Sequence, residues 1–128
     1  MKKILSTLFI ALYALCANAQ LSQVMLSAEK GDIDAQKFLA RSYSQGINGV
    51  RKNDVQAFIW TKAAAEQGDG EYEYLLSQLY WNGVGTSKDS NAMMEWMERS
   101  ANHGYAPAME NLGFLNFMGG IMKRQFHY

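Results

Sequence analysis

Apolar residues follow a helical spacing through most of the chain, and glycines interrupt this pattern at regular intervals. Between Ala57 and Gly68, and again between Leu75 and Gly83, apolar residues recur every three or four positions. This spacing is typical of amphipathic helices. A glycine directly after the last periodic residue suits a helix end because it adopts the left-handed conformation at little cost. The pattern predicts a helix, a tight turn, a second helix and a loop.

The same four-residue skeleton occurs three times. Each copy has an alanine, a glycine three residues later, a leucine eight residues after that glycine and a second glycine fifteen residues after it. The copies are Ala28, Gly31, Leu39 and Gly46; Ala65, Gly68, Leu76 and Gly83; and Ala101, Gly104, Leu112 and Gly119. We call Gly31, Gly68 and Gly104 the repeat glycines.

A unit of about 36 residues cannot bury its own apolar face, so it stacks on its neighbours and leaves an open binding surface. The sequence therefore predicts an all-α fold, an α-solenoid of three antiparallel helix-turn-helix repeats. We expect the repeats at about residues 21–56, 57–92 and 93–122.

Polar residues and the single proline agree with the predicted helix ends. Asp32, Asp54, Asp69 and Asp89 lie near predicted helix starts, where a carboxylate accepts free backbone N–H bonds. Pro107 falls in the first turn of the last predicted helix, where its missing N–H does little harm.

The run from Ala63 to Gly68, with Leu76, Tyr80 and Gly83 after it, resembles the "KAAEQG…LG..Y..G.G" signature of the Sel-one-like repeats. The segments 28–43 and 100–113 resemble it again, so the resemblance covers roughly residues 21–120. This family forms tetratricopeptide-like α-solenoids, and its members are commonly adaptors that assemble complexes at membranes and envelopes. The resemblance therefore implies a protein-binding module.

Three features depart from the family pattern. Tyr72 stands where the other copies have Ala35 and Ala108, and we expect its ring to push the helices apart or to point outward. After Gly119 the chain has no fourth repeat, and we expect the tail from residue 123 to 128 to fold back over the last hairpin or to reach a partner. The disulfide-rich subtype of the family is excluded because the chain has one cysteine.

The N-terminus has the pattern of a secretory signal peptide. Two lysines precede the apolar run from Ile4 to Cys16, and Ala17–Ala19 is a small-residue cleavage site, which predicts that residues 1–19 are removed before Gln20. In a lipoprotein signal Cys16 would instead be lipidated, but Leu15 occupies the position that requires a small residue. The apolar run is also shorter than the roughly 20 residues that span a bilayer, so no membrane span is expected.

Composition and chemistry narrow the function. The part after residue 19 has 10 Lys and Arg against 12 Asp and Glu, a balance that does not favour nucleic acid as a partner. We expect no cofactor, metal or catalytic site. His103 is expected to close a helix before Gly104. The carboxylates around the turn of the second repeat are expected to be solvated: Glu66, Asp69, Glu71 and Glu73.

A candidate partner surface lies on the helices that precede the repeat glycines. Ten residues before each repeat glycine stand Leu21, Phe58 and Met94, and Lys62 and Glu98 lie one turn later in the second and third copies. Stacked repeats align these residues into one ladder. The ladder is either buried between neighbouring repeats or an apolar groove whose polarity Lys62 and Glu98 set.

The sequence thus predicts a secreted or periplasmic protein-interaction module that binds another protein and is not an enzyme. The first alternative is an immunity or inhibitor protein for a toxin or an envelope enzyme. A remote alternative is a cell-wall or β-lactam hydrolase, as in some cysteine-rich relatives. Oligomeric state cannot be inferred from these patterns.

Overall fold

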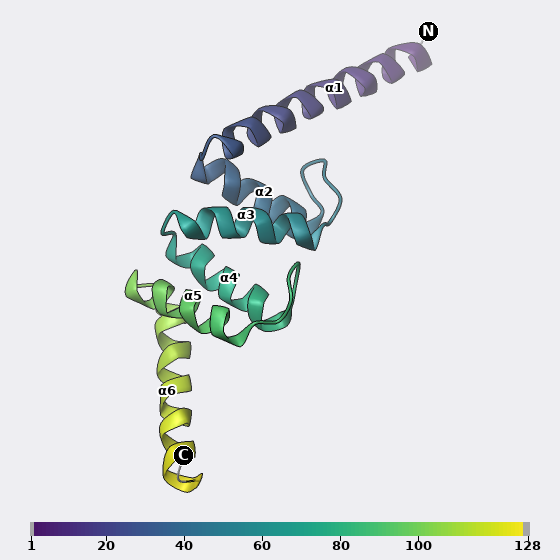
Figure 1. The fold of residues 1–128 in the computed structure, drawn as a ribbon. Helices are drawn as coiled ribbons and strands as arrows, with labels where there is room; N and C mark the ends of the chain where they lie inside the picture. Colours follow the sequence, from purple (N-terminus) through teal and green to yellow (C-terminus); the bar gives the residue numbers. More distant parts are fainter. Residues whose placement is uncertain (1, 127–128) are drawn as a thin grey trace.

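Six helices make up most of residues 2–126, the part of the chain that the structure describes. In this computed structural model they are α1 (Lys2–Glu29), α2 (Ile33–Gln45), α3 (Asp54–Glu66), α4 (Gly70–Asn82), α5 (Ser90–Asn102) and α6 (Ala106–Phe126) (Figure 1). Residues 2–126 contain no strand. The predicted all-α fold is confirmed.

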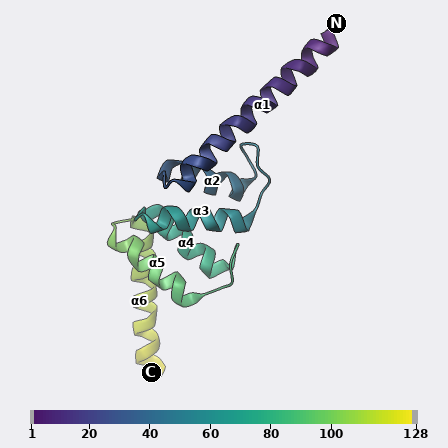
Figure 2. The same ribbon diagram turned by 45° about the horizontal axis from the view of Figure 1, so that its top comes forward.

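The helices form a stack in which extensive contacts join consecutive helices. The most closely packed pairs are α2 with α3 and α4 with α5, and the contact between α3 and α4 joins these two hairpins. In both views α1 and α6 project from opposite ends of the stack, so the outer ends of these two helices lie far apart (Figures 1 and 2). This nearest-neighbour packing is that of a helical solenoid.

Side-chain caps begin the inner helices, largely as predicted. Asp32, Asp69 and Asp89 each accept a hydrogen bond from the backbone N–H three residues later, at 2.9 to 3.0 Å. At the start of α3 the cap is Asn53, which accepts from the N–H of Gln56 at 3.1 Å, while Asp54 is the first helical residue. These bonds satisfy backbone donors that the helix leaves free.

The turn glycines behave as predicted except at the last position. All three repeat glycines have positive φ, and Gly46 and Gly83 end α2 and α4 in the left-handed conformation. Gly119 instead lies inside α6, which continues to Phe126. After Gly46 and Gly83 the chain leads into α3 and α5, which pack on α2 and α4, whereas no helix in the described part follows α6 to favour a turn at Gly119.

The prediction for Tyr72 was wrong, because its ring lies in the core. Tyr72 is only 4% exposed and packs in a cluster with Ala40, Ala64, Ala65, Leu76 and Trp96. Its hydroxyl donates to the Lys37 carbonyl at 3.3 Å. Alanines from α2 and α3 leave the space that the ring occupies, so the bulky residue fills the core instead of leaving it.

A polar contact between the two helices of a closely packed pair recurs at equivalent positions. The residue before one repeat glycine contacts the residue five positions after the previous repeat glycine. Gln67 Nε2 donates to Gln36 Oε1 at 2.8 Å and to the Gly31 carbonyl at 2.9 Å. One unit later, His103 Nδ1 lies 2.5 Å from Glu73 Oε1. This contact joins the two helices of each closely packed pair.

The expectation of a solvated carboxylate cluster was therefore partly wrong. Glu73 is 2% exposed and paired with His103. Asp69 forms an ion pair with Lys37 of α2 at 2.5 Å. Glu66 and Glu71 are exposed, as expected. His103 does follow the last residue of α5, also as expected.

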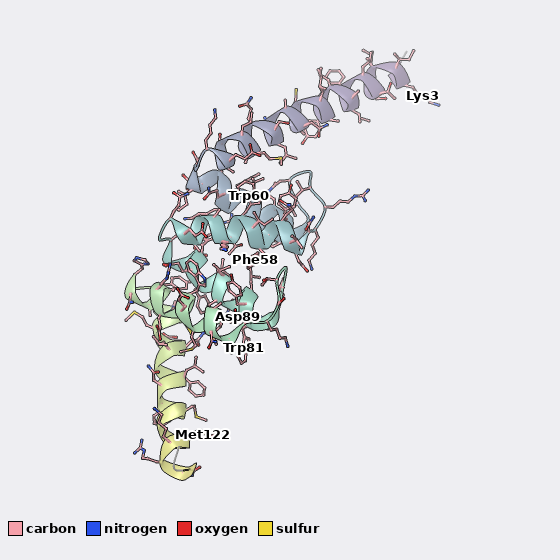
Figure 3. All side chains as sticks on the ribbon, in the orientation of Figure 1. Lys3, Phe58, Trp60, Trp81, Asp89 and Met122 are labelled. Atoms are coloured by element: carbon pink, nitrogen blue, oxygen red, sulfur yellow. The ribbon has the colours of Figure 1, made fainter. Side chains whose placement is uncertain are left out.

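Both ends of the stack carry exposed apolar surface. Part of α1 is apolar enough, by length and composition, to cross a membrane, and its 18-residue apolar window is entirely exposed; a signal sequence has the same properties. Residues 123–126 continue α6 and do not fold back over the last hairpin, while residues 127 and 128 lie outside the described part. Figure 3 shows Lys3 and Met122 on these projecting ends.

Candidate protein-binding groove

The structure places the five predicted partner-binding residues on three helices. Leu21, on α1, is half-buried and lines a cavity between α1 and α2. Phe58, on α3, packs against the core and meets the Tyr80 ring edge-on at 5.4 Å between centroids. Lys62, also on α3, is half-buried.

The remaining two predicted residues lie on α5. Met94 packs against a second core cluster formed by Met93, Met97 and Ala108, and Glu98 is exposed. Phe58 and Met94 thus lie at the edges of two different clusters. The partner-binding role of the ladder remains a prediction.

Two cavities occupy the same place in successive units. The first is lined by Ala40, Arg41 and Ser44 of α2, Ala57 and Thr61 of α3, and Leu75, Gln78 and Leu79 of α4, among others. The second is lined by Ser77, Gln78 and Trp81 of α4, Met93 and Met97 of α5, and Asn111, Phe114 and Leu115 of α6. Each residue of the second set is the repeat equivalent of one in the first.

Gln78 lines both cavities, which therefore adjoin, and we call the surface that contains them the helix groove. It runs across α2, α4 and α6, the helices that follow the repeat glycines. The helices that precede these glycines contribute only its floor, through Ala57 and Thr61 in the first cavity and Met93 and Met97 in the second.

The helix groove changes from polar to apolar along the stack. Ten residues after the repeat glycine stand Arg41, Gln78 and then Phe114. Trp81 is 61% exposed and Phe114 63% exposed, and they flank a cavity of about 210 Å³. An exposed aromatic pair beside an apolar cavity is the kind of surface that accepts an apolar side chain of a partner. Figure 3 shows Trp81 at the outer edge of the hairpin of α4 and α5.

A tyrosine hydroxyl fixes the polar residues of the apolar end. Tyr74 Oη accepts hydrogen bonds from Gln78 Nε2 at 2.9 Å and from Asn111 Nδ2 at 2.8 Å. The Tyr74 ring packs against Tyr105 at 5.4 Å between centroids. These contacts hold the amides on both sides of the cavity, so this end of the helix groove is preorganised and loses little side-chain entropy on binding.

Two groups with raised pKa values lie at the polar end of the helix groove, Tyr72 in its lining and Lys37 against the Tyr72 ring. A hydrogen bond to Asp69 raises the pKa of Lys37, whose ammonium group lies 5.4 Å from the centre of the Tyr72 ring. Burial raises the pKa of the Tyr72 hydroxyl, although Arg41 partly opposes this shift. Lys37 and Tyr72 therefore stay protonated at neutral pH and act in packing rather than in proton transfer.

The sequence reasoning did not identify Trp81 or Phe114. The predicted ladder lies on the helices before the repeat glycines, whereas the helix groove is formed mainly by the helices after them. The signal that could have found these residues is the series Arg41, Gln78 and Phe114, in which one repeat position becomes progressively more apolar.

The fold and its repeated groove define a class, the α-helical repeat proteins that form solenoids. The Sel1 repeat model matches residues 33–69, 70–105 and 106–127. This chain belongs to the Sel1 repeat family, whose repeats mediate protein–protein interaction, and the resemblance inferred from the sequence is confirmed. The matched units begin with the helix after each repeat glycine, so the closely packed pairs α2–α3 and α4–α5 each form one unit.

Two regulators are among the similar proteins. The chain is 37% identical over 90 residues to chitin synthase regulator SKT5 of Saccharomyces cerevisiae, covering 70% of this chain and 13% of that protein. It is 27% identical over 103 residues to an exopolysaccharide production negative regulator of Rhizobium leguminosarum bv. viciae, covering 80% of this chain and 36% of the relative. The chain therefore spans only a minor part of each regulator.

Solved structures share the fold. A Sel1 repeat protein from Oxalobacter formigenes matches with a TM-score of 0.68 and 34% identity, covering 73% of this chain and 38% of that one. The protein c5321, a protective antigen of uropathogenic Escherichia coli, matches with a TM-score of 0.70 and 26% identity, covering 77% and 21%. Both similarities support a Sel1-type solenoid.

Proposed function

We propose that this protein is a secreted or periplasmic, non-catalytic interaction module that binds a partner protein in the helix groove. The apolar end, where Trp81 and Phe114 flank a cavity of about 210 Å³, is the observation that carries this proposal. A cavity of this size accepts one large apolar side chain of the partner. The amides that Tyr74 holds in place supply polar contacts at its rim.

Affinity capture with groove variants tests the binding site. The tagged protein and its Trp81→Ser and Phe114→Ser variants are used to capture partners from envelope extracts. We expect each variant to retain the helical circular dichroism and to lose a partner that the wild type enriches, because truncating an aromatic hot-spot residue costs about 2 kcal/mol of binding free energy. Trp81 is exposed, so its loss opens no core cavity. The exposed Glu95→Ala variant is the matched control. Equal enrichment by all variants would contradict the proposed site.

The proposed location depends on the N-terminal segment. The exposed apolar part of α1 is compatible with a signal peptide that is removed before Gln20. The intact mass of the protein purified from its native host then corresponds to residues 20–128. A full-length species in the membrane fraction would indicate an anchor, and a diacylglyceryl mass on Cys16 would indicate a lipoprotein.

The identity of the partner separates two roles. The regulators among the relatives favour an adaptor that controls another protein. An immunity or inhibitor protein has the same architecture. A toxin or an envelope enzyme captured in a stable one-to-one complex, with its activity blocked, would support the inhibitor role. Enrichment of several members of one assembly would support the adaptor role.

A further inference from the structure

The last helix keeps a contact face that no other helix of the described part covers. In α2 and α4, the residue five positions after the repeat glycine is buried by the following helix: Gln36 is 6% exposed and Glu73 2% exposed. Gln67 and His103 cover them. The equivalent residue of α6 is Met109, which is 53% exposed.

A second position shows that α6 retains the shape needed for a covering helix. Nine residues after the repeat glycine, α2 has Ala40 and α4 has Ser77, both buried small residues that permit close helix approach. At the same position α6 has Gly113, and a Cβ atom added there would meet nothing within 4 Å. The uncovered face of α6, which also includes Leu112 and Asn116, thus continues the register of the interfaces between α2 and α3 and between α4 and α5.

The inner interfaces indicate what kind of helix covers such a face. In α3, Trp60 packs on the core seven residues before Gln67, and in α5, Trp96 packs on it seven residues before His103. Between them, four residues after each tryptophan, stands a buried small residue, Ala64 or Ser100. The covering pattern is therefore a large apolar residue at i, a small residue at i+4 and a contact residue at i+7, all on one helix face.

At α6 the contact residue must differ from the inner ones. Gln67 and His103 face polar partners, but the same position on α6 is Met109. A glutamine or histidine placed over Met109 would lack the side-chain partner that Gln36 or Glu73 supplies, whereas an apolar residue there would bury the Met109 side chain. The helix that fits α6 therefore carries an apolar residue at i+7.

A second copy of this chain fits the face poorly. Within residues 2–126 the one helix without a preceding partner in the stack is α1, where the equivalent positions hold Gln23, Ser27 and, just after its end, Lys30. Gln23 replaces the tryptophan, and Lys30 would bring a charge onto Met109. Burying an unpaired ammonium group is costly, so the chemistry of α1 disfavours head-to-tail stacking.

We propose that this α6 face docks an amphipathic helix of a partner protein with a large apolar residue at i, a small residue at i+4 and an apolar residue at i+7. This inference rests on the proposed function, because it assigns a second surface and the chemistry of its partner. It follows from the continuity of the α6 face with the two established helix interfaces.

A peptide taken from the chain itself tests the proposal. The probe covers residues 88–104, carries His103→Leu and Arg99→Lys, and is held helical by a lactam between Glu95 and the new lysine, at the site of an exposed i,i+4 ion pair. The matched control retains His103. Titration of the purified protein, followed by fluorescence anisotropy, should show at least tenfold tighter binding of the leucine probe. A probe that also carries Trp96→Ala should lose binding.

Variants of the protein locate the site. Gly113→Leu should abolish probe binding by blocking close approach, whereas Gly113→Ala, which restores the residue type of Ala40, should bind. Met109→Gln should reverse the preference between the leucine and histidine probes. Circular dichroism checks that each variant is folded.

Equal binding of the two probes, no binding of either, or binding that Gly113→Leu leaves unchanged would overturn this proposal. Self-association of the protein in sedimentation experiments would also overturn the proposal if Gly113→Leu removes that association. The occupant of the α6 face would then be a second copy of this chain. A failure here leaves the helix groove intact if Trp81→Ser still removes a partner in affinity capture. If both experiments fail, the proposed function fails as well.

Discussion

The pair formed by buried Glu73 and half-exposed His103 should make a measurable contribution to the packing of α4 against α5. We consider the change His103→Ala, which leaves the Glu73 carboxylate without its partner at a site that is only 2% exposed. Breaking a fully buried ion pair costs about 3–5 kcal/mol. The His103 side chain is 51% exposed, so water reaches the carboxylate after the change, and we expect a smaller loss of about 1–3 kcal/mol.

The preceding interface supplies the rescue variant. The double change Glu73→Gln with His103→Gln recreates the pair that Gln36 and Gln67 form at 2.8 Å. Because the equivalent site already accommodates two amides, the double variant should lie within about 1 kcal/mol of the wild-type free energy of unfolding. The pair is therefore expected to be exchangeable as a unit and intolerant of the loss of one partner.

Urea denaturation followed by circular dichroism measures these free energies, and a constant m-value shows that cooperativity is unchanged. The matched control is Glu95→Ala, which removes an exposed ion pair with Arg99 and should change stability by less than about 1 kcal/mol. The reasoning is refuted if His103→Ala is no more destabilising than Glu95→Ala. It is also refuted if the double glutamine variant is as unstable as His103→Ala.

Three further predictions concern the core, the ladder and alkaline pH. Leu76 is fully buried, so Leu76→Ala should cost about 2–5 kcal/mol through cavity formation, and a melting temperature equal to that of the wild type would contradict the packing. If the predicted ladder binds a partner, Phe58→Ser should weaken capture while circular dichroism and melting temperature hold; unfolding would show that Phe58 serves the core. The stability that Lys37 and Tyr72 contribute should be fully present below about pH 10 and lost above it, because the fold raises the pKa of both groups; a pH series of melts checks this, and Lys37→Met should reduce the loss.

The repeat and its helix ends could be predicted because they depend on local sequence. A glycine after an amphipathic stretch, or an aspartate before one, acts within a single turn, as the caps at Asp32, Asp69 and Asp89 show. Gly119 was mispredicted because a glycine permits a turn without requiring one. The turns at Gly46 and Gly83 are each followed by a helix that packs back on the one before the turn, α3 on α2 and α5 on α4.

The environment of Tyr72 and Glu73 could not be predicted because it depends on residues from other helices. The space for the Tyr72 ring comes from alanines of α2 and α3, and the partner of Glu73 lies 30 residues later. The helix groove was missed for a similar reason. Trp81 and Phe114 stand 33 residues apart and come together only when α4 and α6 stack on α5.

Site-specific photocrosslinking tests most directly whether the helix groove holds the partner. p-Benzoylphenylalanine is placed at position 81, inside the apolar end, and at position 95, on the exposed face of α5, and the cells are irradiated before extraction. The account predicts one discrete crosslinked protein from position 81, none from position 95, and loss of the product when Phe114→Ser is added. A crosslink of equal yield from both positions, or a product that survives Phe114→Ser, would contradict binding in the helix groove.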